Sequence, residues 1–209
     1  MPDLPSTSSL ARPDQDLSDL IRAAQKGASG GLPPVDKWHP DFCGDLDMEI
    51  QSDGTWFYLG TPIGRAALVK LFSSVLIKEG GAFFLVTPVE KVGLRVEDAP
   101  FVAVEMAVQN QVLPDQILVL RTNVDDVVEV GPKNPLRFAF EGDENQLKPY
   151  VLVRNVRGEL EALLSRPLLY QLVDLGEEVE VDGVTMFAVR SGGQIFPIMP
   201  ADELARLSA

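Results

Sequence analysis

The chain has 209 residues, of which 45% are hydrophobic and 23% are charged, and this balance excludes a wholly disordered protein. Its 31 acidic residues outnumber 18 basic ones, for a formal net charge of −13, so neither nucleic acid nor an anionic membrane surface is expected as a partner. A single cysteine excludes a disulfide within the chain and favours a reducing, cytoplasmic location. No secretory signal and no run approaching the roughly 18 apolar residues of a transmembrane helix is recognisable.

The first 33 residues are predicted to form a loose tail, a short helix and a linker. Residues 1–13 are rich in proline and serine and show no hydrophobic period. A helix is predicted over 13–27, because leucine, isoleucine and alanine recur there at helical spacing and Gly27 can end it. The following stretch, GASGGLPP at 27–34, is typical of a linker.

The next segment predicts a hairpin, a helix and a strand, in that order. The hairpin is expected over 46–60, because Asp53-Gly54 between two strand-like runs is a strong turn signal. The helix is expected from Thr61, whose hydroxyl can cap it, to Gly80. The strand is expected at 82–87, where the run AFFLVT is typical of a buried strand.

The middle of the chain is predicted to be rich in strands. Short runs at 92–97, 101–109 and 116–121 are separated by prolines, which is typical of consecutive antiparallel strands.

The last third is predicted to repeat the order of the first. Its elements are two strands at 136–142 and 149–154, a helix over 155–176 that Pro167 should kink or split, a hairpin on Asp182-Gly183 and a final strand at 194–199. The fold class is therefore α+β, with two similar β-β-α-β-type units, a β-rich middle and a short N-terminal helix. The expected domains are 34–110 and 111–209, after the N-terminal segment 1–33.

Three long stretches carry a family resemblance. They are PPVDKWHPDFCGDLDMEI, DGTWFYLGTPIGRAALVKLFSSVL and FFLVTPVEKVGLRVEDAPFVAVE. They resemble a bacterial family known as domain of unknown function 1285, and the resemblance extends over nearly all of the chain after residue 30. It implies a two-part α+β fold with a repeated motif and a role in signalling or regulation. It implies no catalytic residues.

The chain's only histidine and only cysteine, His39 and Cys43, lie four residues apart. A helix would bring them together, but Pro40 and Gly44 argue against a helix. A catalytic thiol needs a neighbouring base and usually a third orienting group, and no second histidine exists. Cys43 is therefore predicted to be a small buried residue before a strand.

Acidic residues cluster in the same stretch, at Asp41, Asp45, Asp47 and Glu49. Their oxygens could bind Mg²⁺ or Ca²⁺, but the spacing does not match a calcium-binding loop. The alternation of acidic and apolar residues over 45–50 indicates a strand whose acidic face meets water. The strand interpretation is favoured, so no metal and no cofactor is predicted.

Other residues could bind a ligand or a partner. A glycine-bounded turn precedes Arg65 at a possible helix start, which can attract phosphate. The basic residues Lys91 and Arg95 could recognise an anion. The hairpin that carries Trp56 and Tyr58 could present one aromatic face to a partner. The complete candidate set is Trp38, His39, Trp56, Tyr58, Arg65, Lys91 and Arg95.

The absence of a coherent catalytic set favours a binding protein over an enzyme. The leading hypothesis is a cytoplasmic module that senses a small ligand or binds a protein partner, with a role in signalling or regulation. One alternative is a metal-assisted hydrolase that uses the acids at 41–49. Another is a structural subunit whose aromatic hairpin packs in a homo-oligomer.

Overall fold

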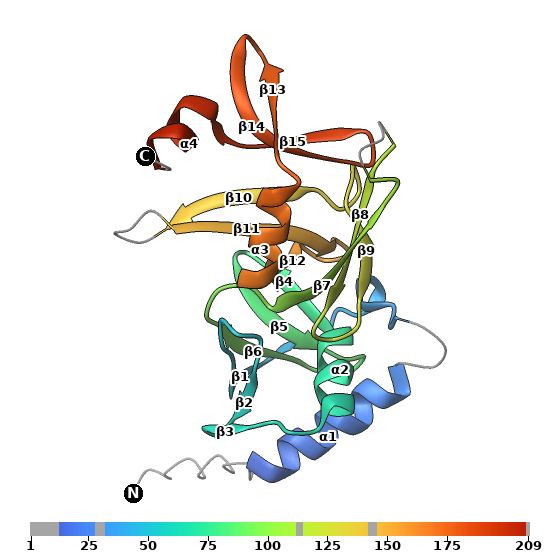
Figure 1. Cartoon of the computed structure of the whole chain (residues 1–209). Coiled ribbons are helices and arrows are strands. Elements are labelled where there is room, and N and C mark those ends of the chain that lie inside the picture. Colours follow the sequence, from blue (N-terminus) through green and yellow to red (C-terminus); the bar gives the residue numbers. More distant parts are fainter. Residues whose placement is uncertain (1–12, 28–31, 112–114, 142–145, 208–209) are drawn as a thin grey trace, which may run out of the picture.

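The structure is a computed structural model that describes residues 13–27, 32–111, 115–141 and 146–207. Strands dominate and helices are few, which confirms the α+β class. Three sheets follow one another along the molecule, with the first at the bottom of Figure 1 and the third at the top. Among the described residues no helix is long and apolar enough to cross a membrane.

The first sheet has six strands in the order β3-β2-β1-β6-β5-β4. Their bounds are Phe42–Ile50 for β1, Trp56–Tyr58 for β2, Thr61–Pro62 for β3, Leu76–Glu79 for β4, Ala82–Val86 for β5 and Lys91–Val96 for β6. Helix α2 (Ala66–Ser74) lies between β3 and β4 and contacts the N-terminal helix α1 (Pro13–Gly27), whereas a short 3-10 helix, η1 (Val35–Lys37), precedes β1.

The second sheet also has six strands, in the order β10-β11-β12-β7-β8-β9. Their bounds are Phe101–Gln109 for β7, Ile117–Thr122 for β8, Val127–Glu129 for β9, Leu136–Glu141 for β10, Gln146–Arg154 for β11 and Leu160–Leu164 for β12. Each of the two sheets consists of two antiparallel meanders of three strands. The first strand of the first meander pairs in parallel with the last strand of the second, β1 with β6 in one sheet and β7 with β12 in the other.

The repeated unit is therefore the six-stranded sheet. The predicted β-β-α-β pattern is not the element that recurs, because α2 lies inside the first unit whereas α3 (Arg166–Asp174) follows the last strand of the second. The third sheet, β13-β14-β15, comes after α3 and stands outside the repeat. Its strands are β13 (Glu177–Val181), β14 (Val184–Ser191) and β15 (Gln194–Pro200), and helix α4 (Ala201–Leu207) packs on β14 and β15.

Two predicted helices are shorter than the sequence indicated. The helix expected from Thr61 to Gly80 begins only at Ala66, because Thr61 and Pro62 pair with β2, and it gives way to β4 at Leu76. The helix expected over 155–176 is wrong in its first half.

Residues 160–164 form β12, where alternate side chains are buried in the core. The sequence LEALL has good helix formers, but its burial between β11 and β7 outweighs that propensity. Pro167 lies in the first turn of α3 and does not kink it, since a proline in the first turn of a helix interrupts no hydrogen bond.

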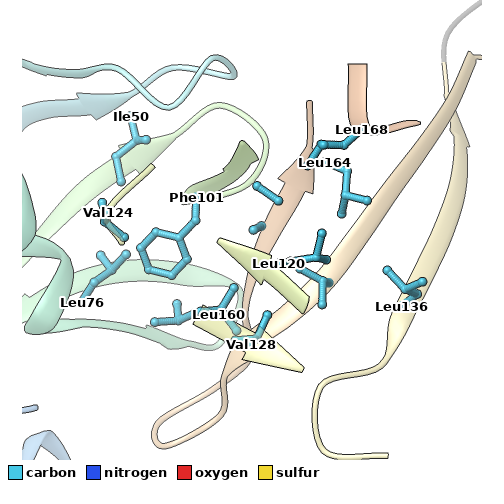
Figure 2. Close-up of a cluster of buried hydrophobic side chains, with 14 of the residues drawn as sticks. Ile50, Leu76, Phe101, Leu120, Val124, Val128, Leu136, Leu160, Leu164 and Leu168 are labelled. Atoms are coloured by element: carbon cyan, nitrogen blue, oxygen red, sulfur yellow. The ribbon is translucent and has the colours of Figure 1, made fainter. Parts of the chain in front are cut away.

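One hydrophobic core runs through the molecule. Phe101, the first residue of β7, is fully buried where the first two sheets meet. Figure 2 shows its ring between Ile50 and Leu76 of the first sheet and Leu120 and Leu160 of the second. Because the two sheets share this core, neither buries its inner face alone.

The turn between β11 and β12 closes the β4 edge of the first sheet. The backbone N–H of Lys78 donates to the carbonyl oxygen of Arg157 at 2.9 Å. Gly158 has a positive φ of 87°, and a Cβ at this position would overlap the carbonyl oxygen of Lys78. Glycine is therefore needed here for its backbone conformation and for the close approach of the two chains.

We expect Gly158→Ala to destabilise the fold much more than Gly183→Ala. Gly183, in the β13–β14 turn, has a similar φ of 81°, but nothing lies within 4 Å of its missing Cβ. Left-handed strain of about 1–2 kcal/mol affects both variants, whereas overlap with β4 should add about 1–3 kcal/mol to Gly158→Ala alone. Urea unfolding measures the difference, and equal losses in the two variants would contradict the close contact.

Candidate functional site

The aromatic residues of the first hairpin belong to the core. Trp56 is 1% exposed and stacks on Phe72 with ring centroids 6.1 Å apart. Tyr58 and Trp38 are half-buried and pack against the same core. Trp56 therefore presents no surface to a ligand or partner in this structure.

The predicted basic residues lie apart from one another. Arg65 and His39 are exposed at separate places in the first unit. Lys91 pairs with Glu79 at 3.1 Å and lies over the Phe84 ring, 5.0 Å from its centroid. Such surface pairs contribute little by themselves.

Arg95 lies near the other end of β6 and pairs with Glu49 at 3.0 Å. With Asp47, Gln51 and Phe57 it lines a cleft of about 260 Å³, which Lys91 does not reach. The structure thus joins Arg95 to the acidic residues of β1 rather than to a second cation. Because its charge is balanced by Glu49, this cleft has no clear preference for anions.

The acidic stretch itself forms the exposed face of β1. Asp45 and Asp47 are exposed, whereas Met48 and Ile50 are fully buried, which confirms the predicted alternation. Within the described ranges no three histidine, cysteine or acidic side chains gather as a metal site requires.

The prediction of a buried Cys43 is wrong. Cys43 is exposed, and its thiol lies 3.4 Å from the carbonyl oxygen of Asp41. It stands at the outer end of β1, before the alternation that buries Met48 and Ile50 begins, so no core surface covers it.

A larger cleft of about 420 Å³ lies between β11 and α3 and was not predicted. It opens where β12 ends. The backbone N–H of Ser165 donates to the carbonyl oxygen of Ala103 at 3.0 Å, and the chain then turns into α3. Strand β11 runs antiparallel to β12 and begins beyond the point where β12 ends. Its first residues therefore lie opposite the helix, across the cleft.

Apolar side chains form most of this cleft and polar side chains complete it. The apolar residues are Leu147, Pro149, Leu163, Leu164 and Leu169, and the polar or aromatic ones are Gln146, Lys148, Arg166 and Tyr170. Tyr170 is 57% exposed, and its hydroxyl accepts a hydrogen bond from Arg166 Nε at 3.2 Å. This hydrogen bond raises the pKa of Arg166, which is charged at any physiological pH.

Lys148 is held in place by two carboxylates. Its Nζ donates to Asp98 and to Glu141, each at 2.8 Å. These hydrogen bonds, first that to Asp98, raise the pKa of Lys148, so it also stays charged. Arg166, in contrast, has no carboxylate partner among the described residues, so its charge is available to a ligand.

A buried tyrosine fixes the strand that carries Lys148. Tyr150 is 2% exposed, and its hydroxyl donates to Asp98 at 2.8 Å. The Arg137 guanidinium lies over the Tyr150 ring, 4.1 Å from its centroid, and forms two hydrogen bonds with Glu161. These contacts fix β11 next to the residues that line the cleft.

The lining of the cleft is mostly apolar, with few polar groups. Among its described lining residues there is no serine, cysteine, histidine, aspartate or glutamate that could act as a nucleophile or a general base. Its size and mostly apolar lining are those of a small-ligand site, for which about 300–1,000 Å³ is usual. The charge of Lys148 is balanced by Asp98 and Glu141, so it is Arg166 that favours a ligand with negative charge.

The sequence did not predict this cleft, because the residues of its two walls were expected in a turn and in a long helix. Residues 142–148 were assigned to a turn and residues 155–176 to one helix, whereas Lys148 lies in β11 and Arg166 begins α3. The Arg166-Pro167 pair was the available signal, since proline is common in the first turn of a helix.

We expect Tyr150 to ionise well above the ordinary tyrosine pKa of about 10. Burial is the main cause of this raised pKa, and the hydrogen bond to the Asp98 carboxylate adds to it. The folded-state pKa lies above the unfolded one, so the contribution of Tyr150 to stability is complete below about pH 10 and is lost as the pH rises beyond it.

Alkaline titration of tyrosinate absorbance in the wild type and in Tyr150→Phe isolates this group. The difference between the two curves should be a component with a midpoint well above pH 10, and stability should fall less steeply at high pH in the variant. A difference component at or below pH 10 would contradict the burial and hydrogen bonding of Tyr150.

The comparisons with known proteins agree with this architecture. The model of the N-terminal domain of domain of unknown function 1285 matches residues 33–99, and that of the C-terminal domain matches residues 100–198. A crystal structure of a DUF1285 family protein from Silicibacter pomeroyi DSS-3 is 48% identical and has a TM-score of 0.79, over 90% of this chain and 98% of that one.

A second DUF1285 family protein, from Shewanella baltica OS155, is 32% identical over 62% of this chain and 91% of that one, with a TM-score of 0.48. The comparison with curated proteins gives no match. The two family models together extend from η1 to β15, and the sequence resemblance is thereby confirmed: the chain belongs to the DUF1285 family.

Proposed function

We propose that this protein is a binding module that takes an anionic, partly apolar ligand in the cleft between β11 and α3. One observation carries the proposal: in a chain with a net charge of −13, the described lining of this cleft has no carboxylate and includes Arg166, whose charge no carboxylate of the described residues balances. A ligand carboxylate or phosphate can pair with Arg166, and the apolar part of the ligand can cover Leu164 and Leu169. A sensing role in signalling or regulation is consistent with binding that involves no chemistry.

The test uses hexanoate as the probe, with hexanol as the uncharged match and inorganic phosphate as an anion without an apolar part. Hexanoate should raise the thermal midpoint in a saturable way, because a ligand that binds only the folded state stabilises it by about 2.7 kcal/mol at a hundredfold excess over its Kd. Hexanol and phosphate should raise the midpoint much less. Amide shifts in an NMR titration should map to residues 146–148, 166 and 168–170.

Arg166→Gln should weaken hexanoate binding about fivefold, which corresponds to about 1 kcal/mol. The matched control is Arg206→Gln, because Arg206 is an exposed arginine on α4 with a side chain 76% exposed. The proposal would be overturned by no response to hexanoate, or by equal binding to the wild type and Arg166→Gln.

A further inference from the structure

Strand β11 has an open edge inside the cleft. It pairs with β10 from Gln146 onward, but with β12 only from Tyr150 onward. Over Leu147–Pro149 no strand of the described chain pairs with β11 on the α3 side. Unpaired backbone groups on a strand edge are a template for another strand, and their hydrogen bonds give affinity to an added peptide.

Several other sheet edges are closed to such pairing. Pro62 in β3 and Pro197 and Pro200 in β15 remove backbone donors from their strands. At the β4 edge, the carbonyl oxygen of Arg157 accepts the hydrogen bond of Lys78 N–H. The acidic residues of β13 make that edge repel another acidic strand. On its α3 side, the β11 edge has only one of these protections, which is the missing backbone donor of Pro149.

The lining of the cleft defines the side chains that an added strand needs. Successive side chains of a strand point to opposite faces, so Leu147 and Pro149 share one face and Lys148 points to the other. An added strand would place every second residue against Leu164 and Leu169, which favours apolar side chains there. The residues between them would face the side of Lys148, whose charge Asp98 and Glu141 already balance, so Arg166 alone selects for a carboxylate.

We propose that the cleft binds an extended segment of a partner protein, with alternating apolar and acidic residues, as an additional strand on β11 at Leu147–Pro149. This inference rests on the proposed function and identifies its ligand. Backbone pairing provides the affinity that is common to all extended segments, and the apolar lining together with Arg166 selects acidic, apolar ones.

The probe is a capped five-residue peptide of alternating valine and glutamate with a fluorescent label, and binding is followed by fluorescence anisotropy. One comparison peptide has the same residues in two blocks, which keeps composition and charge but loses the alternation. Another carries N-methyl groups on the backbone, which removes the donors that pair a strand. Both should bind at least tenfold more weakly than the alternating peptide.

Variants of the chain test the side-chain contacts. Arg166→Glu should abolish binding of the valine–glutamate peptide and should improve binding of a valine–lysine peptide. Arg206→Glu changes the net charge equally at a distant helix and should do neither. Tyr170→Ala, at an exposed position, should weaken the valine–glutamate peptide several-fold without loss of folding.

Amide hydrogen exchange provides a readout that a small anion does not produce. The peptide should slow exchange of the Leu147 N–H, because this is the backbone donor of the segment that points away from β10 toward the open edge, whereas hexanoate should leave its exchange unchanged.

The outcomes separate this inference from the proposed function. Hexanoate binding that depends on Arg166, without peptide binding, would refute strand addition and leave the small-anion site. Equal binding of the N-methylated and unmodified peptides would refute it as well. No binding of hexanoate or of any peptide would overturn both proposals.

Discussion

Two arginines near the β11–β12 turn hold the two repeated sheets together. Arg154 pairs with Asp126, donates to the carbonyl oxygen of Ser73 at 2.8 Å, and lies over the Phe101 ring, 5.0 Å from its centroid. Its side chain is 11% exposed. A charge so far from water is tolerated only when its donors are used; here Nε and Nη2 bond Asp126 within the second unit, and Nη1 reaches Ser73 in the first.

Arg157 does the same at the other end of the turn. Its guanidinium donates to the carbonyl oxygens of Val35 and Trp38 and pairs with Glu79, and the hydrogen bond from Arg157 lowers the pKa of that carboxyl. It thereby attaches η1 and β4 to the turn.

The cleft arises from a difference between the two units in strand length and in the helix that follows. By strand order, β5 and β6 of the first sheet correspond to β11 and β12 of the second. Strand β5 has five residues and β11 has nine, and the chain after β6 passes directly to β7, whereas after β12 it forms α3. The longer strand and the added helix are therefore features of the second unit alone. The repeated scaffold supplies the sheet, and its departure from the repeat creates the cleft.

Local patterns predicted the turns and the strand faces but not this departure. Each Asp-Gly turn, at 182–183 and at 53–54, is determined by two adjacent residues, and the alternation of β1 by one strand. Turns and strand faces can therefore be predicted from sequence. The end of β12 is different, because it depends on which neighbours LEALL packs against after folding. The cleft depends in turn on the unequal lengths of two paired strands, which no local pattern contains.

The net charge of the chain explains why ligand binding in the cleft would need both its cation and its apolar side chains. At a distance, a chain of net charge −13 repels an anionic ligand, and this repulsion extends over about 8 Å at physiological ionic strength. Close to the cleft, Arg166 attracts the same ligand, but an exposed ion pair contributes only up to about 1 kcal/mol. An anion without an apolar part would therefore gain little. The apolar side chains must supply most of the affinity, and the cation then selects among apolar ligands those that carry a negative charge.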